Sequence, residues 1–170
     1  MAQSQARRAQ SLIDKTKIEE AYQLLTKELK KDTLSSAEKY VLANLFFNPV
    51  FVNNNLDSAY FYVLEALEAY DLTSAKAQAR LVNNGFNKEL FGQLKDEIEI
   101  AGFLRAKDGG KEQDYINFLT EFPTSLQVDS AIILRNIEAF ITAEKINTFQ
   151  SCILIQIRNI YLCRTRSCKP

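Results

Sequence analysis

Few side chains in this 170-residue chain are of types that do chemistry, and histidine, the commonest general base, is absent. The densest carboxylates are the pair Glu19–Glu20 and the cluster formed by Asp96, Glu97 and Glu99. On a helix, adjacent residues point in different directions and the cluster shares only part of one face. We therefore expect solvated surface at both places, and we expect the protein not to be an enzyme.

Two further signals of site chemistry are equally weak. Gly109-Gly110 is not a phosphate-binding loop, because no GxxxxGK pattern follows and Lys111 has no Ser or Thr after it. The three cysteines all lie after residue 151, and they come without histidines or a CxxC pair: Cys152, Cys163 and Cys168. Such a set is a poor metal site and a poor disulfide framework, so we expect no metal and no cofactor.

Charge is balanced over the whole chain but unevenly distributed. Of the 21 basic and 21 acidic side chains, four basic and no acidic ones follow residue 149, which leaves 17 basic against 21 acidic before it. Residues 1–149 therefore carry a net negative charge and lack the clustered basic face that phosphate contacts require. No apolar run approaches the roughly eighteen residues of a membrane span. We therefore expect neither nucleic acid nor a membrane span among its interactions.

The first residues leave the compartment open. Met1 to Gln5 are small and polar, like the residues that signal cleavage leaves behind, and they also fit a native cytoplasmic start. A periplasmic (exported) location and a cytoplasmic one are equally compatible with this sequence.

The composition and periodicity predict an all-α fold. Five glycines and three prolines are too few for many tight turns. The clearest helix covers residues 56–70, where an Asn run can cap the start and apolar residues recur at helical spacing. By the same criterion we expect seven further helices, over residues 4–14, 17–31, 36–47, 74–82, 88–106, 111–122 and 124–146, paired in antiparallel fashion.

Local signals mark several helix ends. Ser35 and Glu38 fit a capping box, Asn87 can cap the helix that follows it, and Gly85 is a good C-terminal signal. Residues 48–55 form a longer loop than a helical hairpin needs. We expect three of its apolar residues to fold back onto the neighbouring helices: Val50, Phe51 and Val52.

The chain also carries an internal repeat, with spacings of about 37 and 38 residues that are typical of helix–turn–helix solenoids. Leu42-Ala43-Asn44-Leu45-Phe46, followed by Leu56-Asp57-Ser58-Ala59-Tyr60-Phe61-Tyr62 and Ala66, resembles a tetratricopeptide-like or Sel1-like repeat. The segment Tyr115-Ile116-Asn117-Phe118-Leu119-Thr120-Glu121-Phe122-Pro123-Thr124-Ser125, with Ala131, is similar to the repeats of bacterial envelope tetratricopeptide proteins.

This resemblance implies a short α-solenoid of about four stacked helix pairs over residues 1–150. It also implies a concave face on which Tyr40, Asn44 and Phe47 are exposed to a protein or peptide ligand, although ordinary packing between repeats is the alternative for Tyr40 and Phe47. The expected function is a non-catalytic protein–protein interaction scaffold. Two alternatives stay open: a structural or oligomerisation module of the bacterial cell envelope, acting as a homo-oligomer, and the N-terminal repeat region of a larger enzyme.

Residues 151–170 depart from the repeat. The period predicts an amphipathic helix over residues 147–160, but Cys152-Ile153-Leu154-Ile155-Gln156-Ile157 is a β-prone apolar run, and the tail is basic. One hypothesis is that the tail has lost the repeat register, so that its removal leaves the melting temperature nearly unchanged. The alternatives are a tail that docks on a membrane or partner, and a last helix that extends and caps the array.

Overall fold

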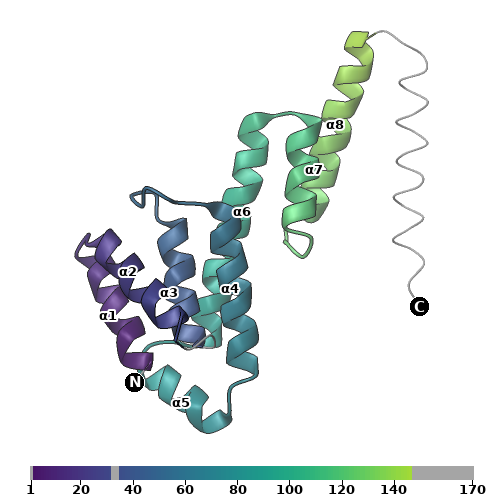
Figure 1. The fold of residues 1–170 in the computed structure, drawn as a ribbon. Coiled ribbons are helices and arrows are strands. Elements are labelled where there is room, and N and C mark those ends of the chain that lie inside the picture. The colour runs from purple at the N-terminus through teal and green to yellow at the C-terminus, as the bar shows by residue number, and fades with distance from the viewer. Residues whose placement is uncertain (1, 32–34, 147–170) are drawn as a thin grey trace. The chain divides into compact units, whose positions relative to one another are not determined.

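The fold is all-α. The computed structural model describes residues 2–31 and 35–146, and within these ranges it contains eight helices and no strand (Figure 1). The predicted all-α class and the order of the eight helices are confirmed. Their bounds are α1 Ala2–Asp14, α2 Ile18–Leu29, α3 Ser36–Phe47, α4 Leu56–Asp71, α5 Ala75–Asn83, α6 Lys88–Gly109, α7 Glu112–Glu121 and α8 Val128–Ile146.

The chain divides into two compact units, residues 1–100 and residues 101–170. The first unit contains α1 to α5 and the N-terminal part of α6, and the second contains the C-terminal part of α6 with α7 and α8. The predicted tail, residues 151–170, lies outside the described residues.

Small side chains allow the helices of the first unit to pack closely. α1 contacts α2 and α3, α2 contacts α3, and α3 contacts α4 (Figure 1). The alanines at these contacts have no exposed surface: Ala6, Ala9, Ala21, Ala37, Ala43, Ala59 and Ala66. Because an alanine brings two helix backbones near one another, the few buried apolar residues of α1, namely Ala6, Ala9 and Ile13, are enough to hold that helix in place.

Helix α3 lies at the centre of the first unit. Its bounds agree with the predicted 36–47, and all but three of its residues are buried. Ser35 is the N-cap residue by position, but its side chain makes no capping hydrogen bond, so the predicted capping box is wrong. The first turn is itself buried, with Ser36 3% exposed and Lys39 7% exposed. Burial of this first turn, rather than a cap, stabilises the end of the helix.

Two other predicted caps are confirmed. The Asn55 side chain accepts a hydrogen bond from the Ser58 N–H at 2.7 Å and begins α4. The Asn87 side chain accepts one from the Leu90 N–H, also at 2.7 Å, at the start of α6. Between α5 and α6, Gly85 has φ +84°, a left-handed conformation that glycine adopts without strain.

The loop between α3 and α4 is anchored by one aromatic side chain. Phe51 is 2% exposed, and its ring lies 5.2 Å from Tyr22 and 5.6 Å from Phe46, measured between centroids. The valines on either side of it are not buried: Val50 is 70% exposed and Val52 is 95% exposed. The prediction that all three fold back therefore holds for Phe51 and is wrong for the two valines, because a tight turn buries only one of three successive side chains.

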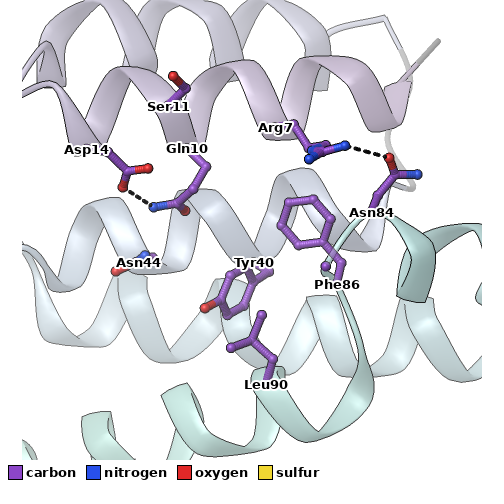
Figure 2. A pocket seen from close by; sticks show the side chains of 10 residues that line it. Arg7, Gln10, Ser11, Asp14, Tyr40, Asn44, Asn84, Phe86 and Leu90 are labelled. Atoms are coloured by element: carbon purple, nitrogen blue, oxygen red, sulfur yellow. Dashed lines mark hydrogen bonds between the residues drawn. The ribbon is translucent and has the colours of Figure 1, made fainter.

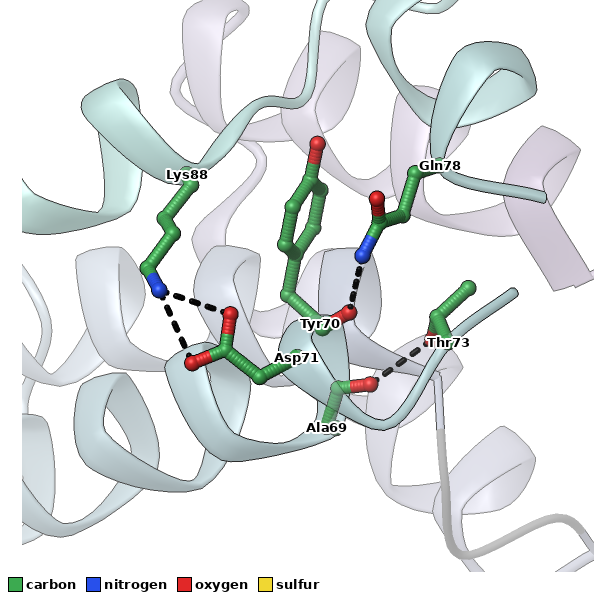
Figure 3. A network of polar contacts seen from close by, with 6 residues as sticks. All are labelled: Ala69, Tyr70, Asp71, Thr73, Gln78 and Lys88. Carbon is green, nitrogen blue, oxygen red and sulfur yellow. Dashed lines mark hydrogen bonds and ion pairs between the residues drawn. The ribbon is translucent and has the colours of Figure 1, made fainter. Parts of the chain in front are cut away.

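Polar contacts at the C-terminal end of α4 hold α5 and the start of α6 (Figure 3). Lys88 Nζ pairs with Asp71 Oδ1 at 2.7 Å, and Gln78 Nε2 donates to the Tyr70 carbonyl at 2.9 Å. Thr73 Oγ1 donates to the carbonyl of Ala69 one turn earlier, at 2.7 Å. These contacts fix the connection between α5 and α6, which contributes to the pocket described below.

In the second unit, α7 packs between the C-terminal part of α6 and α8. The Phe103 and Phe118 rings meet edge to face at 5.5 Å, and Phe122 has no exposed surface. α8 begins at Val128, later than the predicted 124, because Ser125 makes a local turn in which its Oγ accepts the Gln127 N–H at 3.2 Å. Helix α6 also runs three residues beyond the predicted 106, to Gly109.

Candidate functional site

The first unit contains a pocket of about 410 Å³, which we call the α1–α3 pocket (Figure 2). Three parts of the chain form it: the polar side of α1, the middle of α3, and the connection from α5 into α6. The lining residues are Arg7, Gln10, Ser11, Asp14, Tyr40, Asn44, Asn84, Gly85, Phe86 and Leu90.

Helix α1 supplies the charged and amide groups of this pocket. Its buried alanines face α2 and α3, which leaves the polar residues next to them at the pocket edge. Arg7 Nη1 donates to Asn84 Oδ1 at 3.4 Å, a long contact, and Gln10 Nε2 donates to Asp14 Oδ1 at 3.0 Å. The pocket-lining residues of α1 therefore form a polar row with a cation, Arg7, at one end and an anion, Asp14, at the other.

One acceptor in the pocket has no donor. Gln10 Oε1 is buried and accepts no hydrogen bond from any described residue, and in Figure 2 the Gln10 amide points from α1 toward α3. Turning the amide over would place this oxygen against the Asp14 carboxylate, so the assigned orientation is the favourable one. An unsatisfied buried acceptor costs about 1–3 kcal/mol, and a donor that reaches this oxygen once the side chains covering it shift would remove that cost.

Aromatic rings form the apolar side of the pocket. Tyr40 is 8% exposed and stacks on Phe91, with ring centroids 4.8 Å apart and planes 19° apart. Phe86 meets Tyr40 edge to face at 6.1 Å. Burial raises the pKa of Tyr40 above its usual value, and the negative charge of Glu97 raises it further. Tyr40 therefore lines the pocket as a rigid, neutral side chain.

The structure brings together two of the three residues predicted as partner-binding. Tyr40 and Asn44 lie one turn apart on α3 and both line the pocket, whereas Phe47 is half-buried at the end of α3 and lies outside the lining. The contributions of α1 and of the α5–α6 connection were not predicted from the sequence. The buried stripe Ala6–Ala9 was the available signal, since small residues at that spacing indicate close approach to another helix.

The two carboxylate groups considered for catalysis have ordinary structural roles. Glu20 pairs with Lys17 at 2.9 Å, and Glu19 accepts a hydrogen bond from Gln23. Glu99, which we expected at the surface, is instead 1% exposed, so that prediction is wrong. Lys95 Nζ lies 2.6 Å from Glu99 Oε1, and the Tyr60 hydroxyl donates to the same oxygen, contacts that compensate for the lost hydration.

The second unit has a smaller pocket of about 320 Å³, lined by Gly102, Arg105, Ala106, Asp114, Asn117, Phe118 and Glu121. Its charged groups already serve the fold. Arg105 pairs with Glu121, and Asp114 Oδ2 accepts the Lys111 N–H at the start of α7. The α1–α3 pocket, with its unsatisfied acceptor, is the better candidate for a ligand.

Comparison with known proteins identifies no relative: no protein-family model matches the sequence, and no curated protein or solved structure matches it significantly. Within residues 2–31 and 35–146, no group of three or more metal-ligating side chains comes together. None of the helices in those ranges combines the length and the apolar character needed to cross a membrane.

Proposed function

We propose that this chain is a non-catalytic protein-binding module, built of tetratricopeptide-like helix pairs, that holds an extended peptide segment of a partner protein in the α1–α3 pocket. Consecutive helices that contact one another support the repeat architecture, namely α1 with α2, α3 with α4, and α7 with α8. The buried alanines at these contacts are the small residues on which such arrays depend.

The pocket's polar groups match the chemistry of a peptide main chain. Gln10, Asn44 and Asn84 each carry an amide that both donates and accepts, as the peptide group does. Seven residues of helix separate Arg7 from Asp14, which is about 10 Å, or about three residues of extended peptide. A segment with an acidic side chain near Arg7 and a basic one near Asp14 fits this row best.

The single observation that carries the proposal is the buried, unpartnered Gln10 Oε1 beside the rings of Tyr40 and Phe86. A peptide N–H that displaces the side chains covering that oxygen would satisfy it, and an apolar side chain of the peptide would pack on the rings and Leu90. A small number of anchors of this kind supply most of the affinity of a peptide complex.

The test is selection from a random linear peptide library on the immobilised full chain, followed by titration of the enriched peptides by fluorescence anisotropy. Gln10→Leu and Asn44→Ala should each weaken binding about tenfold, as the loss of one well-placed hydrogen bond does. Gln23→Leu is the matched control, because Gln23 is an exposed glutamine on α2 outside the pocket.

Phe47→Ala separates this pocket from the wider predicted surface. Binding that survives Phe47→Ala and fails with Gln10→Leu supports the α1–α3 pocket. Peptides that bind equally to all variants, or a library that yields no enriched sequence, would contradict the proposal and favour an assembly module of the bacterial cell envelope.

A further inference from the structure

Helix α4 exposes three large apolar side chains in one row, which we call the α4 stripe. Phe61 is 57% exposed, Leu64 is 40% exposed, and Leu72, the C-cap residue, is 78% exposed. Steps of three and eight residues place them on the same side of the helix. The opposite side contains the buried residues Ala59, Val63, Ala66 and Tyr70. Apolar side chains gathered on one exposed face mark a site of interaction with another molecule.

The aromatic side chain of the stripe is held in place although it is exposed. The Phe61 ring meets the Tyr62 ring edge to face, with centroids 5.2 Å apart. Tyr62 in turn stacks on Phe46 of α3, with centroids 5.6 Å apart and planes 3° apart. Because these contacts already fix the ring, Phe61 loses little conformational freedom when a partner covers it. An anchor of this kind contributes strongly to affinity.

The charges on α4 are all negative. The helix has four acidic side chains and no basic one: Asp57, Glu65, Glu68 and Asp71. Two of them pair with lysines of α3 and α6, whereas no ion pair or hydrogen bond within residues 2–31 and 35–146 involves the Glu68 carboxylate. Glu68 lies within the stripe, four residues after Leu64 and four before Leu72. A partner that covers the stripe removes water from Glu68, which costs free energy unless that partner supplies a cation.

We propose that the α4 stripe is a second docking surface, for an amphipathic helix of a partner protein that places lysine or arginine opposite Glu68. The stripe runs eleven residues along α4, about 16 Å, which is three turns of a helix laid against it. Charge selects this occupant, because pairing α4 with α4 of a second copy would bring like charges together. The same charges repel an anionic membrane surface. No residue of the stripe lines the α1–α3 pocket, so this proposal does not rest on the pocket.

Two fluorescein-labelled peptides of about eighteen residues test the chemistry of the partner. Both carry leucines at helical spacing, and one has lysines beside the leucines where the other has glutamates. Fluorescence anisotropy on the full chain should show the lysine peptide binding at least about tenfold more tightly, with a smaller difference at high salt. Equal affinity of the two peptides, or no binding of either, would overturn the proposal.

Two substitutions locate the site on α4. Phe61→Ala should weaken binding of the lysine peptide about tenfold, and Glu68→Lys should reverse the preference in favour of the glutamate peptide. Both residues are exposed, so circular dichroism should show an unchanged fold. Ile133→Ala is the matched control, because Ile133 is an equally exposed apolar residue on α8. Equal weakening by Phe61→Ala and Ile133→Ala would contradict a site on α4.

Gln10→Leu separates this surface from the α1–α3 pocket, and it should leave binding of the lysine peptide unchanged. Binding that fails with Gln10→Leu and survives Phe61→Ala would overturn the proposal and place the helix in the pocket. Sedimentation velocity of the free chain gives a further check. A concentration-dependent dimer that Phe61→Ala abolishes would also overturn the proposal and assign the stripe to a second copy of the chain.

Discussion

The hydroxyl of Tyr60 on α4 donates a hydrogen bond to Oε1 of Glu99 on α6, at 3.0 Å. Lys95 Nζ reaches the same oxygen at 2.6 Å from one turn earlier on α6. Because Glu99 is 1% exposed, its charge depends on these two donors in place of water. The arrangement fixes the position of α6 against α4 within the first unit.

Tyr60→Phe should therefore destabilise the protein. The change removes one donor to a buried charged group, which costs about 1.5–3 kcal/mol in the free energy of unfolding. Urea denaturation followed by circular dichroism measures it. Tyr62→Phe is the control, because Tyr62 is half-buried and stacked on Phe46. Equal effects of the two changes would mean that the Glu99 contact contributes nothing.

Two glycines of α6 should respond in opposite directions to alanine. A Cβ on Gly102 would lie 2.5 Å from Cε2 of Phe122, whereas a Cβ on Gly92 has no atom within 4 Å. Gly102→Ala should cost about 1–3 kcal/mol through overpacking, and Gly92→Ala should stabilise α6 by about 0.5–1 kcal/mol. Melting curves of both variants test this pair, and a neutral Gly102→Ala would contradict the close approach of α6 and α7.

Asn55, the N-cap residue of α4, should contribute more to the free energy of unfolding than Ser35, the N-cap residue of α3. Asn55→Ala removes the 2.7 Å hydrogen bond to the Ser58 N–H and should cost about 1 kcal/mol. Ser35→Ala removes no capping hydrogen bond and should change the free energy of unfolding by less than about 0.5 kcal/mol. Chemical denaturation of the two variants measures this difference. A larger loss of stability in Ser35→Ala than in Asn55→Ala would support the predicted capping box.

Tyr40 should make stability fall at alkaline pH. Burial raises its pKa in the folded protein above the ordinary value of 10.0, so the unfolded chain loses this proton first. Its contribution is complete below pH 10 and is lost as the pH rises through the folded-state pKa. Between pH 9 and 11 the melting temperature of the wild type should fall more steeply than that of Tyr40→Phe. Parallel curves would show that the pKa of Tyr40 is the same in the folded and unfolded states.

Local patterns were enough to predict most of the fold. Apolar spacing located all eight helices, and the Asn55 and Asn87 caps followed from side chains that hydrogen-bond their own chain a few residues on. The wrong predictions concern residues whose burial depends on parts of the chain that are distant in sequence. Glu99 is buried where a tyrosine from α4 lies against it, and Ser35 needs no cap because the first turn of α3 is buried.

The α1–α3 pocket was only half predictable for the same reason. Tyr40 and Asn44 share one face of one helix, which periodicity shows. Gln10 and Phe86 reach the pocket from α1 and from the α5–α6 connection, and no local pattern relates residue 10 to residue 86. Their meeting depends on helix packing, which the buried alanines permit but do not specify.

The loop of residues 48–55 also determines where this chain can change length. The Asn55 N–H donates to the Phe46 carbonyl at 3.0 Å and closes the base of the loop, while Phe51 anchors its middle. The residues between these two points, 52–54, are exposed, and Asn54 donates hydrogen bonds only within the loop, to the Phe51 and Pro49 carbonyls. Lengthening such a stretch costs only about 0.6 kcal/mol for each doubling. Evolutionary insertions, epitope tags and fluorescent reporters are therefore best accommodated after Asn53, where the fold can grow without rebuilding its interior.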